Sequence, residues 1–428
     1  MRWRAAIVLA VLTLGGCAKA PPPAHPVTVT APAATPPAPV ATPVTAAFHG
    51  LGLLAAVQHG RLFILDGATD TQREIAEASI AGAPAWSADG RWLSFTHGDN
   101  QRQVVDAATW QVHDIAGLPG PVVSLAWAPE GHTLAVATAE AIWLLDDPVS
   151  GEPRRLTPAK VKASGVLAWA PDGKSIAFVT SGTDRDEVLN LLRISGGEAE
   201  PWYVARGAAI ELGHWWPDGN GILFWVRPSH CNSCAVDGLP LRSLATDTDK
   251  PVILPTSLLH TNWLSWTPDG ELVMVRGSSR TAWYQKQLAR CNVATGTCRD
   301  LPQPETAVTL DPVLAPDGSR IAMVRAERRP ITWEFTSADV DAWETTRRLW
   351  VADAEGAGAT EVTAAGTAIS GPEWAPDGRH LLYAAGSTLR VIDLDTGANE
   401  LLFDFGGDGG QGYYGQLDYS GYYAWFRQ

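Results

Sequence analysis

The chain has 428 residues, 46% of them hydrophobic, and a formal net charge of −14 at pH 7. Nucleic-acid binding needs clustered Lys and Arg side chains against phosphates, so this charge balance argues against a nucleic-acid partner. A mean hydropathy of −0.04 argues against a polytopic membrane protein. The acidic surplus favours solubility and leaves a cationic partner open without implying one.

Residues 1–17 are typical of a secretory signal. A basic start is followed by the apolar run Ala5–Leu14, which is too short to span a bilayer. The run ends in Leu14-Gly15-Gly16-Cys17, which resembles the lipobox of bacterial lipoproteins, where the cysteine is lipidated and becomes the first mature residue. The following Ala18 resembles the sorting pattern of outer-membrane lipoproteins. We therefore expect a lipid anchor on Cys17 at the outer membrane, facing the periplasm; an ordinary cleaved signal with an idle cysteine is the alternative.

Residues 18–47 form a stretch dominated by Pro, Ala, Thr and Val, with no charged residue from Pro21 to Ala47. Proline at this density favours extended polyproline II and opposes a packed element. We interpret residues 18–47 as a disordered tether that holds residues 48–428 away from a membrane. A ligand for a proline-recognising domain is a second possibility.

A short motif recurs seven times in the rest of the chain. The motif begins with Trp or Leu, and the acidic residue of a Pro-Asp-Gly-like turn follows three positions later. We call the first residue of each copy its head. The seven heads are Trp86, Trp127, Trp169, Trp215, Trp266, Leu314 and Trp374. Successive acidic residues are 41 to 60 residues apart. A period of this size, with short apolar runs and turns between, is typical of a β-propeller.

Each period predicts one four-stranded blade. In Pro171-Asp172-Gly173, proline sets φ for the first corner position, aspartate accepts bonds from nearby amides, and glycine adopts positive φ. The run that follows, Ile176–Val179, is too short for a buried helix and rich in strand formers. Further runs such as Ala141–Asp146 and Arg154–Thr157 complete a period. We predict an all-β fold in which the Trp heads pack between neighbouring blades.

These repeats resemble those of TolB and related periplasmic propellers, which are distant kin of WD-repeat proteins. They are also similar to the non-catalytic propeller of the prolyl oligopeptidase family. The resemblance runs from about Leu51 to the C-terminus. It implies the fold, whereas propellers host many unrelated activities.

Both ends of the repeat region carry incomplete blades. Three strand-like runs, Gly52–Val57, Arg61–Asp66 and Arg73–Ala76, precede the first head without an innermost strand. At the C-terminus, Tyr413–Tyr419 and Tyr422–Phe426 are strand-like runs without a following blade. Propellers close by letting one terminus complete the blade begun by the other. Seven full blades and one shared blade predict eight in total; seven is the alternative, with the terminal pieces as a cover.

Strand order sorts the loops onto two faces. The turn face carries the Pro-Asp-Gly turns, and the loop face carries the links between blades and the loops joining second to third strands. Three insertions fall on the loop face, at Ser181–Glu187, Arg227–Gly238 and Glu327–Thr346. In the last of them, Ser337–Leu349 has near-helical spacing, with Ser337 as the expected N-cap. Long loops on a rigid scaffold carry function, so we expect the binding surface here.

The candidate binding residues on the loop face are Trp333, Phe335, Trp343, His230 and His260. The aromatic residues are expected either to be exposed anchors for a partner or to pack their own loop onto the propeller. The histidines are expected near the loop face, together with His59 and His97. They are either scattered over its loops or gathered around the channel, where imidazole could serve as a base or ligand. No ligand-spaced histidine motif is present, so we predict no metal and no cofactor.

Four cysteines remain after Cys17. Cys291 and Cys298 flank a hairpin turn, which predicts a disulfide across it, and Cys231 and Cys234 predict a second local disulfide. A redox role for the Cys231–Cys234 pair is the alternative, although no thioredoxin-like βαβ pattern surrounds it.

Catalytic signatures are missing: the sequence has no Gly-x-Ser-x-Gly elbow, no phosphate-binding glycine loop and no hydrolase domain after the last repeat. The expected function is therefore a monomeric, lipid-anchored envelope propeller that binds protein or peptide partners without catalysis. The alternative is a propeller enzyme, a lyase or hydrolase acting on a glycan or peptide at a His-lined channel.

Overall fold

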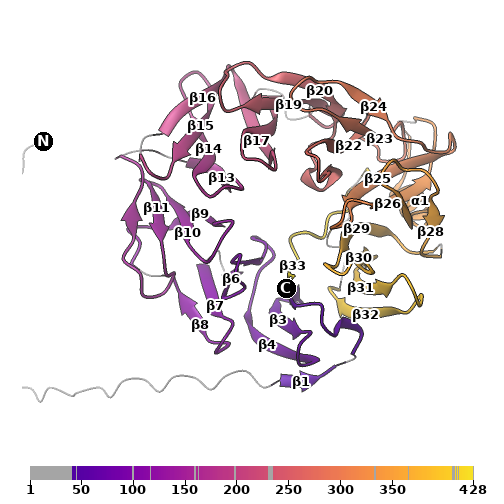
Figure 1. Ribbon diagram of the computed structural model, residues 1–428, viewed down its shortest axis with the longest axis horizontal. Helices are drawn as coiled ribbons and strands as arrows, with labels where there is room; N and C mark the ends of the chain where they lie inside the picture. The colour runs from indigo at the N-terminus through magenta and orange to yellow at the C-terminus, as the bar shows by residue number, and fades with distance from the viewer. Residues whose placement is uncertain are drawn as a thin grey trace, which may run out of the picture. The chain divides into compact units, whose positions relative to one another are not determined.

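The computed structural model describes residues 41–427 except 45, 99–100, 116, 159–160, 162, 197–198, 230–234, 332–333, 365, 407–409, 411 and 413. Strands in this part of the chain form eight antiparallel sheets arranged as blades around an axis, as Figure 1 shows. The prediction of an eight-bladed all-β propeller is confirmed.

Blade 1 is built from both ends of the described chain. Its sheet order is β1-β4-β3-β2-β33, with β1 (Ala41–Pro43), β2 (Leu53–Gln58), β3 (Arg61–Asp66), β4 (Thr71–Glu77) and β33 (Tyr423–Phe426). The innermost strand β33 pairs with β2 in the register Ala55 to Ala424. The expected closure by the C-terminus is therefore confirmed, and it leaves the inner edge of β2 paired.

Seven further blades follow in chain order. Blade 2 contains β5 (Ala85–Trp86), β6 (Trp92–His97), β7 (Gln101–Asp106) and β8 (Val112–Asp114). Blade 3 contains β9 (Val122–Trp127), β10 (Leu134–Thr138), β11 (Ile142–Leu145) and β12 (Arg154–Arg155). Blade 4 contains β13 (Ala163–Trp169), β14 (Ser175–Ser181), β15 (Glu187–Arg193) and β16 (Ala199–Ala205). Blade 5 contains β17 (Ala208–Trp215), β18 (Gly221–Pro228), β19 (Leu239–Ala245) and β20 (Val252–Ser257).

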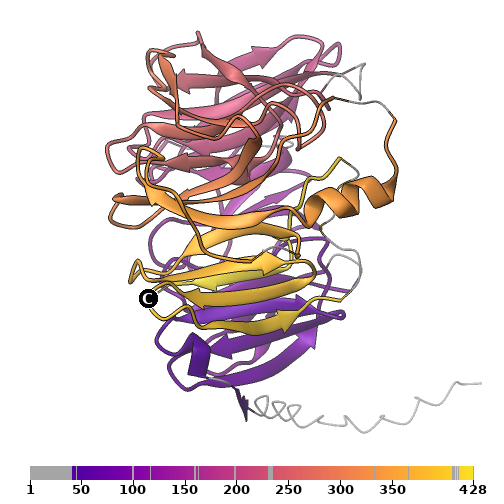
Figure 2. The ribbon, with the colours of Figure 1, turned by 90° about the vertical axis from the view of Figure 1, so that its right-hand side faces the viewer.

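Two of the last three blades, blades 6 and 7, carry a helical element. Blade 6 contains β21 (Leu264–Trp266), β22 (Leu272–Arg276), β23 (Gln287–Cys291) and β24 (Cys298–Asp300), preceded by the 3-10 helix η2 (Thr261–Trp263). Blade 7 contains β25 (Ala307–Leu314), β26 (Arg320–Glu327), β27 (Arg348–Asp353) and β28 (Thr360–Glu361), with α1 (Ser337–Glu344) inserted after β26. Blade 8 contains β29 (Ile369–Trp374), β30 (His380–Ala385), β31 (Thr388–Asp393) and β32 (Asn399–Asp404). Figure 2 shows α1 projecting from one face of the ring, the loop face.

Folded structure begins earlier than the tether prediction places it. The edge strand β1 lies before residue 48, the 3-10 helix η1 (Ala46–Phe48) begins before it, and both belong to the propeller unit. Pro43 ends an edge strand, where a missing backbone N–H is tolerated. Phe48 is 1% exposed and packs on Trp425 of the closing strand, so burial outweighs the local preference for polyproline II.

The tryptophan heads hold neighbouring blades together by a repeated hydrogen bond. The indole Nε1 of Trp127 donates to the carbonyl of Ala85, just before the head of the preceding blade, at 2.9 Å. The same bond recurs at four other joints, namely Trp86 to Ala424, Trp169 to Ala126, Trp215 to Ala168 and Trp374 to Val313. Each indole thus buries apolar area and satisfies its donor, which explains the tryptophan of the motif.

Three joints lack this bond in the described part of the chain. At the closing joint of blades 8 and 1, Nε1 of Trp425 donates within blade 1, to the carbonyl of Leu51. At the joint of blades 5 and 6, the buried Nε1 of Trp266 has no hydrogen-bond partner. At the joint of blades 6 and 7, the head is Leu314, which has no donor to give. The ring of indole bonds is therefore interrupted beside the inner strands of blades 5, 6 and 7.

The insertion after β26 forms the expected helix, but its cap differs from the prediction. Thr336, and not Ser337, is the N-cap: its side chain accepts from the backbone N–H of Asp339, whose carboxylate accepts from the N–H of Thr336. This reciprocal pair of hydrogen bonds is a capping box, and it makes Thr336 a better N-cap than Ser337.

The C-terminal strand prediction is half right. Residues 414–422, here called the crossing segment, form no extended strand and instead pass over the loops of blades 6 and 7 before the chain enters β33. The N–H of Ala282 donates to the carbonyl of Tyr414 at 3.0 Å, and Nε2 of Gln416 donates to the carbonyl of Arg280 at 2.8 Å. The crossing segment is therefore held by hydrogen bonds to the backbone of loops, and it does not pair with the edge strand of a blade.

The disulfide predicted across the β23–β24 hairpin is present between Cys291 and Cys298. Cys291 is fully buried in the core between blades 5 and 6. Cys231 and Cys234, together with Cys17, lie outside the described residues, so the second predicted disulfide and the lipidation site stay predictions.

Candidate functional site

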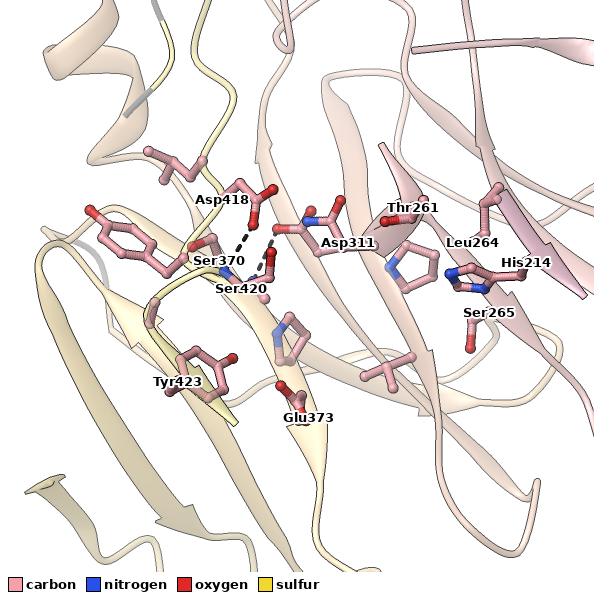
Figure 3. Close-up of a pocket in the computed structure, with 18 of the residues that line it drawn as sticks. His214, Thr261, Leu264, Ser265, Asp311, Ser370, Glu373, Asp418, Ser420 and Tyr423 are labelled. Atoms are coloured by element: carbon pink, nitrogen blue, oxygen red, sulfur yellow. Dashed lines mark hydrogen bonds between the residues drawn. The ribbon is translucent and has the colours of Figure 1, made fainter. Parts of the chain in front are cut away.

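A pocket of about 340 Å³ lies where the inner strands of blades 5 to 8 approach the crossing segment. Its polar lining, labelled in Figure 3, comprises His214, Thr261, Ser265, Asp311, Ser370, Glu373, Asp418, Ser420 and Tyr423. Arg427 also lines it. These side chains come from blades 1, 5, 6, 7 and 8 and from the crossing segment, so only the closed propeller brings them together.

Asp311 is the most unusual residue of the pocket. It sits in a β-bulge of β25, between Leu310 and Val313, and its φ of 48° lies in the left-handed region. Residue Gly371 occupies the equivalent place in blade 8, three positions before the head, with a φ of 54°. A residue with a Cβ pays for this conformation, and strain of this kind is concentrated at functional sites.

The carboxylate of Asp311 is 2% exposed and held at both oxygens. Oδ1 accepts from Nε1 of Trp263 at 2.8 Å, and Oδ2 accepts from the N–H of Gly371 at 3.3 Å. Burial raises the pKa of Asp311, whereas the charge of Arg347 and these two donors oppose the increase. Each oxygen keeps a lone pair that a further donor could use.

His260 forms a second layer behind this carboxylate. Its ring lies 4.9 Å from that of Trp263, the residue that donates to Asp311. Burial lowers the pKa of His260, while Asp311 and Asp418 act in the opposite direction. His214, on β17, lines the pocket itself, and burial lowers its pKa as well. Both imidazoles are therefore neutral at pH 7.

A buried arginine links the pocket to the crossing segment. Arg347 is 1% exposed, and its guanidinium donates to the carbonyls of Ile369 and Gly415, both at 3.3 Å. It also stacks over Trp343 at 5.2 Å. Burial lowers the pKa of Arg347, and Asp311 and Glu344 oppose that change, so two carboxylates share one guanidinium.

Glu344, at the end of α1, supplies a pH-dependent term to stability. It is 2% exposed, its Oε1 has no hydrogen-bond partner among the described residues, and burial raises its pKa from 4.5 to about 7. A carboxyl whose folded pKa exceeds its unfolded pKa contributes stability below the unfolded value, and this contribution is lost as pH rises through the folded value.

We therefore expect Glu344→Gln to become more stabilising, relative to the parent chain, between pH 5 and pH 8. The difference in unfolding free energy should grow by about 2 kcal/mol over this window. Urea unfolding at both pH values measures it. Glu140→Gln, an exposed carboxylate in a blade 3 hairpin, is the matched control and should show no such growth. A pH-independent difference for Glu344→Gln would contradict the assignment.

A buried lysine fixes the loop on which the crossing segment rests. Lys286 is fully buried, and its Nζ donates to the carbonyls of Ser278, Ser279 and Tyr284 at 2.8–3.2 Å. Burial lowers the pKa of Lys286 to about 7. Three carbonyl acceptors match the three protons of an ammonium group, so the lysine acts here as a clamp for the β22–β23 loop.

The structure corrects the picture of exposed aromatic anchors on the loop face. Trp343 is fully buried, and its Nε1 donates to the carbonyl of Glu327 at 2.7 Å. Phe335 is partly buried, with its ring 5.0 Å from Trp283. Both pack their own loop onto the propeller, which was the second of the two expectations. Trp333 and His230 lie outside the described residues.

Of the predicted histidines, His260 lies beside the pocket, whereas His59 and His97 do not line it. Sequence reasoning missed Asp311 and His214. A signal for Asp311 existed: it is the only charged residue three positions before a head among the seven copies. His214 directly precedes the head Trp215 and carried no comparable signal.

Metal-binding clusters and membrane-spanning helices are both absent from the described residues. These residues hold no group of three or more His, Cys, Asp or Glu side chains placed to bind a metal ion. They also hold no helix long and apolar enough to cross a membrane.

No family model and no curated protein sequence matches the chain. Solved structures do match. The chain is similar to dipeptidyl peptidase 4 of Porphyromonas gingivalis, with a TM-score of 0.55 and 10% identity, covering 85% of this chain and 62% of that one. It is also similar to the dihydro-heme d1 dehydrogenase NirN in complex with DHE, with a TM-score of 0.55 and 16% identity, covering 82% and 72% of the two chains.

TolB is also among the matches. The structure from Acinetobacter baumannii is 16% identical, with a TM-score of 0.34 and coverage of 81% of this chain and 62% of that one. Structural neighbours thus include TolB and a prolyl-oligopeptidase-type propeller, as the repeats suggested. At these identities the likenesses show the β-propeller fold alone, and this chain spans less than two thirds of the peptidase.

Proposed function

We propose that this chain is a non-catalytic binding scaffold of the cell envelope, which engages a protein or peptide partner at the axial pocket. The supporting observation is the convergence of polar side chains from several blades and the crossing segment on one cavity of about 340 Å³. A cavity of this size accepts one side chain or a short peptide end rather than a folded domain.

Within the pocket, the charged groups are engaged in positioning contacts. Asp311 is held by Trp263 and Gly371, and Glu373 is paired with Arg427. Groups fixed in this way form a preorganised binding surface, because little side-chain freedom is lost when a ligand arrives. For this reason we favour a binding function over a catalytic one at this pocket.

The anchoring part of the proposal rests on the sequence of residues 1–47. A lipid on Cys17 and an extended proline-rich tether would hold the propeller at the outer membrane, facing the periplasm. Replacing Cys17 with Ser is expected to abolish incorporation of labelled palmitate and to move the chain from the membrane to the soluble fraction. Retention of the label in this variant would contradict the anchor.

Site-specific crosslinking in intact cells tests the binding role. A photoreactive residue at the exposed Ser420, beside the pocket, is expected to capture a discrete partner. The same residue at Lys174, whose side chain is 81% exposed on the turn face, is the matched control and should capture none. Adducts that arise equally from both positions would contradict a partner at the pocket.

A propeller enzyme remains the second candidate, because His214 lines the pocket and His260 lies behind it, both neutral. A neutral imidazole is suited to act as a general base or as a metal ligand. Turnover of an envelope peptide or glycan that is lost in His214→Gln, while Ser420 still crosslinks, would favour the enzyme over the scaffold.

A further inference from the structure

A buried hydroxyl on the pocket wall has no hydrogen-bond partner among the described residues. It belongs to Ser370, which lines the cavity and is 1% exposed. Leaving a buried polar group unpaired costs about 1–3 kcal/mol, so each such group requires an explanation. The Oγ of Ser370 can accept a hydrogen bond from a group that enters the cavity.

The charged side chains of the pocket wall indicate which charge a ligand would carry. Three carboxylates line the cavity, those of Asp311, Glu373 and Asp418, against one cationic side chain, Arg427, which is paired with Glu373. His214 is neutral because burial lowers its pKa. Arg347 does not line the cavity and is shared between Asp311 and Glu344. The lining therefore carries more carboxyl groups than cationic side chains, and a cation that enters would favour the ionised form of Asp311, whose pKa burial raises.

Two carboxylates that form no salt bridge with any described residue lie together in this cavity. Asp311 and Asp418 both line it, and Figure 3 shows Asp418 and Ser420 of the crossing segment next to Asp311. Burial raises the pKa of Tyr423, and the charges of Asp418 and Asp311 raise it further, so both carboxylates lie within electrostatic range of the same group. Oδ1 of Asp418 accepts the N–H of Ser420, and this carboxylate has no other hydrogen bond among the described residues, so acceptor capacity is left on both Asp311 and Asp418.

We propose that the axial pocket binds an organic cation, a primary ammonium or a guanidinium group, which donates to Asp311, Asp418 and the Oγ of Ser370. An ammonium group carries three donors and a guanidinium five, which suits two carboxylates and one hydroxyl. The crossing segment supplies Asp418, so the site is complete only when that segment lies over blades 6 and 7. This inference rests on the proposed binding function and names the chemistry of its ligand.

Such a cation can be the side chain of a Lys or Arg residue in a protein partner or a free diamine. Calorimetry with the purified full-length chain separates the sources. The probes are N-acetyl-lysine amide, N-acetyl-arginine amide and putrescine, with N-acetyl-norleucine amide and N-acetyl-citrulline amide as uncharged counterparts. We expect the basic probes to bind and the uncharged ones not to bind. Tighter binding of the amino-acid amides identifies a protein side chain, and tighter binding of putrescine identifies a free amine.

The variants Asp418→Asn and Asp311→Asn are each expected to weaken binding of the basic probes at least about tenfold, because each removes one charge of the clamp. Asp418 is exposed, so its variant should fold even if Asp311→Asn does not. Glu140→Gln, which lies outside the pocket, is the matched control and should bind like the parent chain. Equal binding by Asp418→Asn, or equal binding of charged and uncharged probes, overturns the proposal.

This test is separate from that of the scaffold function. Loss of cation binding with retained crosslinking at Ser420 would refute the ligand chemistry and leave the scaffold in place. Cation binding without any crosslinked partner would support the ligand chemistry and refute the protein-binding scaffold.

Discussion

A chain that ends at Tyr422, and therefore lacks β33, is expected to lose cooperative folding. β33 is the innermost strand of blade 1, and without it the inner edge of β2 is unpaired. The truncation also removes Trp425, which donates to the carbonyl of Leu51 at 2.7 Å, and the carbonyl of Ala424 that Trp86 of blade 2 uses at 3.1 Å. Blade 1 would then lose its bonds both within the sheet and to its neighbour.

Thermal unfolding and size-exclusion chromatography measure this effect. We expect a loss of the cooperative transition or a fall in Tm well above 10 °C, roughly the effect of several kcal/mol. A chain ending at Phe426 is the matched control, because it keeps β33 and loses only the surface contacts of Arg427. These are its ion pair with Glu373 and its stacking over Trp425 at 4.7 Å, each worth about 1 kcal/mol or less. A peptide covering residues 419–428, added in trans, should restore the transition. An unchanged Tm in the Tyr422 variant would show that the ring does not depend on this closure.

The variant Arg347→Met is expected to destabilise the fold by about 3 kcal/mol, because a buried charge shared by two carboxylates is removed. Two carbonyls, those of Ile369 and Gly415, lose their donors at the same time. The neighbouring Arg348→Met is the matched control: Arg348 pairs with Glu361 at the surface, where such pairs contribute about 1 kcal/mol or less.

Denaturant unfolding at pH 7 gives the difference, and hydrogen exchange of the crossing segment shows whether Gly415 has been released. The double variant Glu344→Gln with Arg347→Met should recover part of the loss, because it removes one of the two uncompensated carboxylates. Stability of Arg347→Met within 0.5 kcal/mol of the parent chain would show that the guanidinium is not the link between the pocket and the crossing segment.

The fold could be predicted from the sequence because its cause is local and repeated. Each head and each Pro-Asp-Gly turn acts within one blade or on the next one, so seven copies give seven independent indications of the same structure. The closing strand was predictable for a similar reason: three N-terminal strands lacked an inner partner, and Tyr422–Phe426 offered one. Trp425 occupies the position of a head in blade 1, but the sequence did not predict this because no turn motif follows it.

The pocket could not be predicted in the same way, because it depends on what differs between blades. Asp311 is a departure from the repeat, and its meaning depends on Trp263 and Gly371, which lie 48 and 60 residues away in the chain. The crossing segment has no counterpart in other blades, so no pattern indicated that it would leave blade 8 and contact Arg280 and Ala282. The sequence indicated Trp343 as a notable residue but did not predict whether it is buried or exposed, because an aromatic residue in an inserted loop can either pack the loop or bind a partner.

The interrupted ring of indole bonds has a mechanical consequence. The side chains of the heads Trp266 and Leu314 donate no hydrogen bond to the preceding blade. The joints on both sides of blade 6, here called the seam, depend on other contacts, such as the bond from the N–H of Leu314 to Oγ of Ser265. The crossing segment is fastened on both sides of that seam, to Arg280 in blade 6 and to Arg347 in blade 7. A ligand in the pocket would touch the same two blades, and we expect its arrival to stiffen the propeller along the seam.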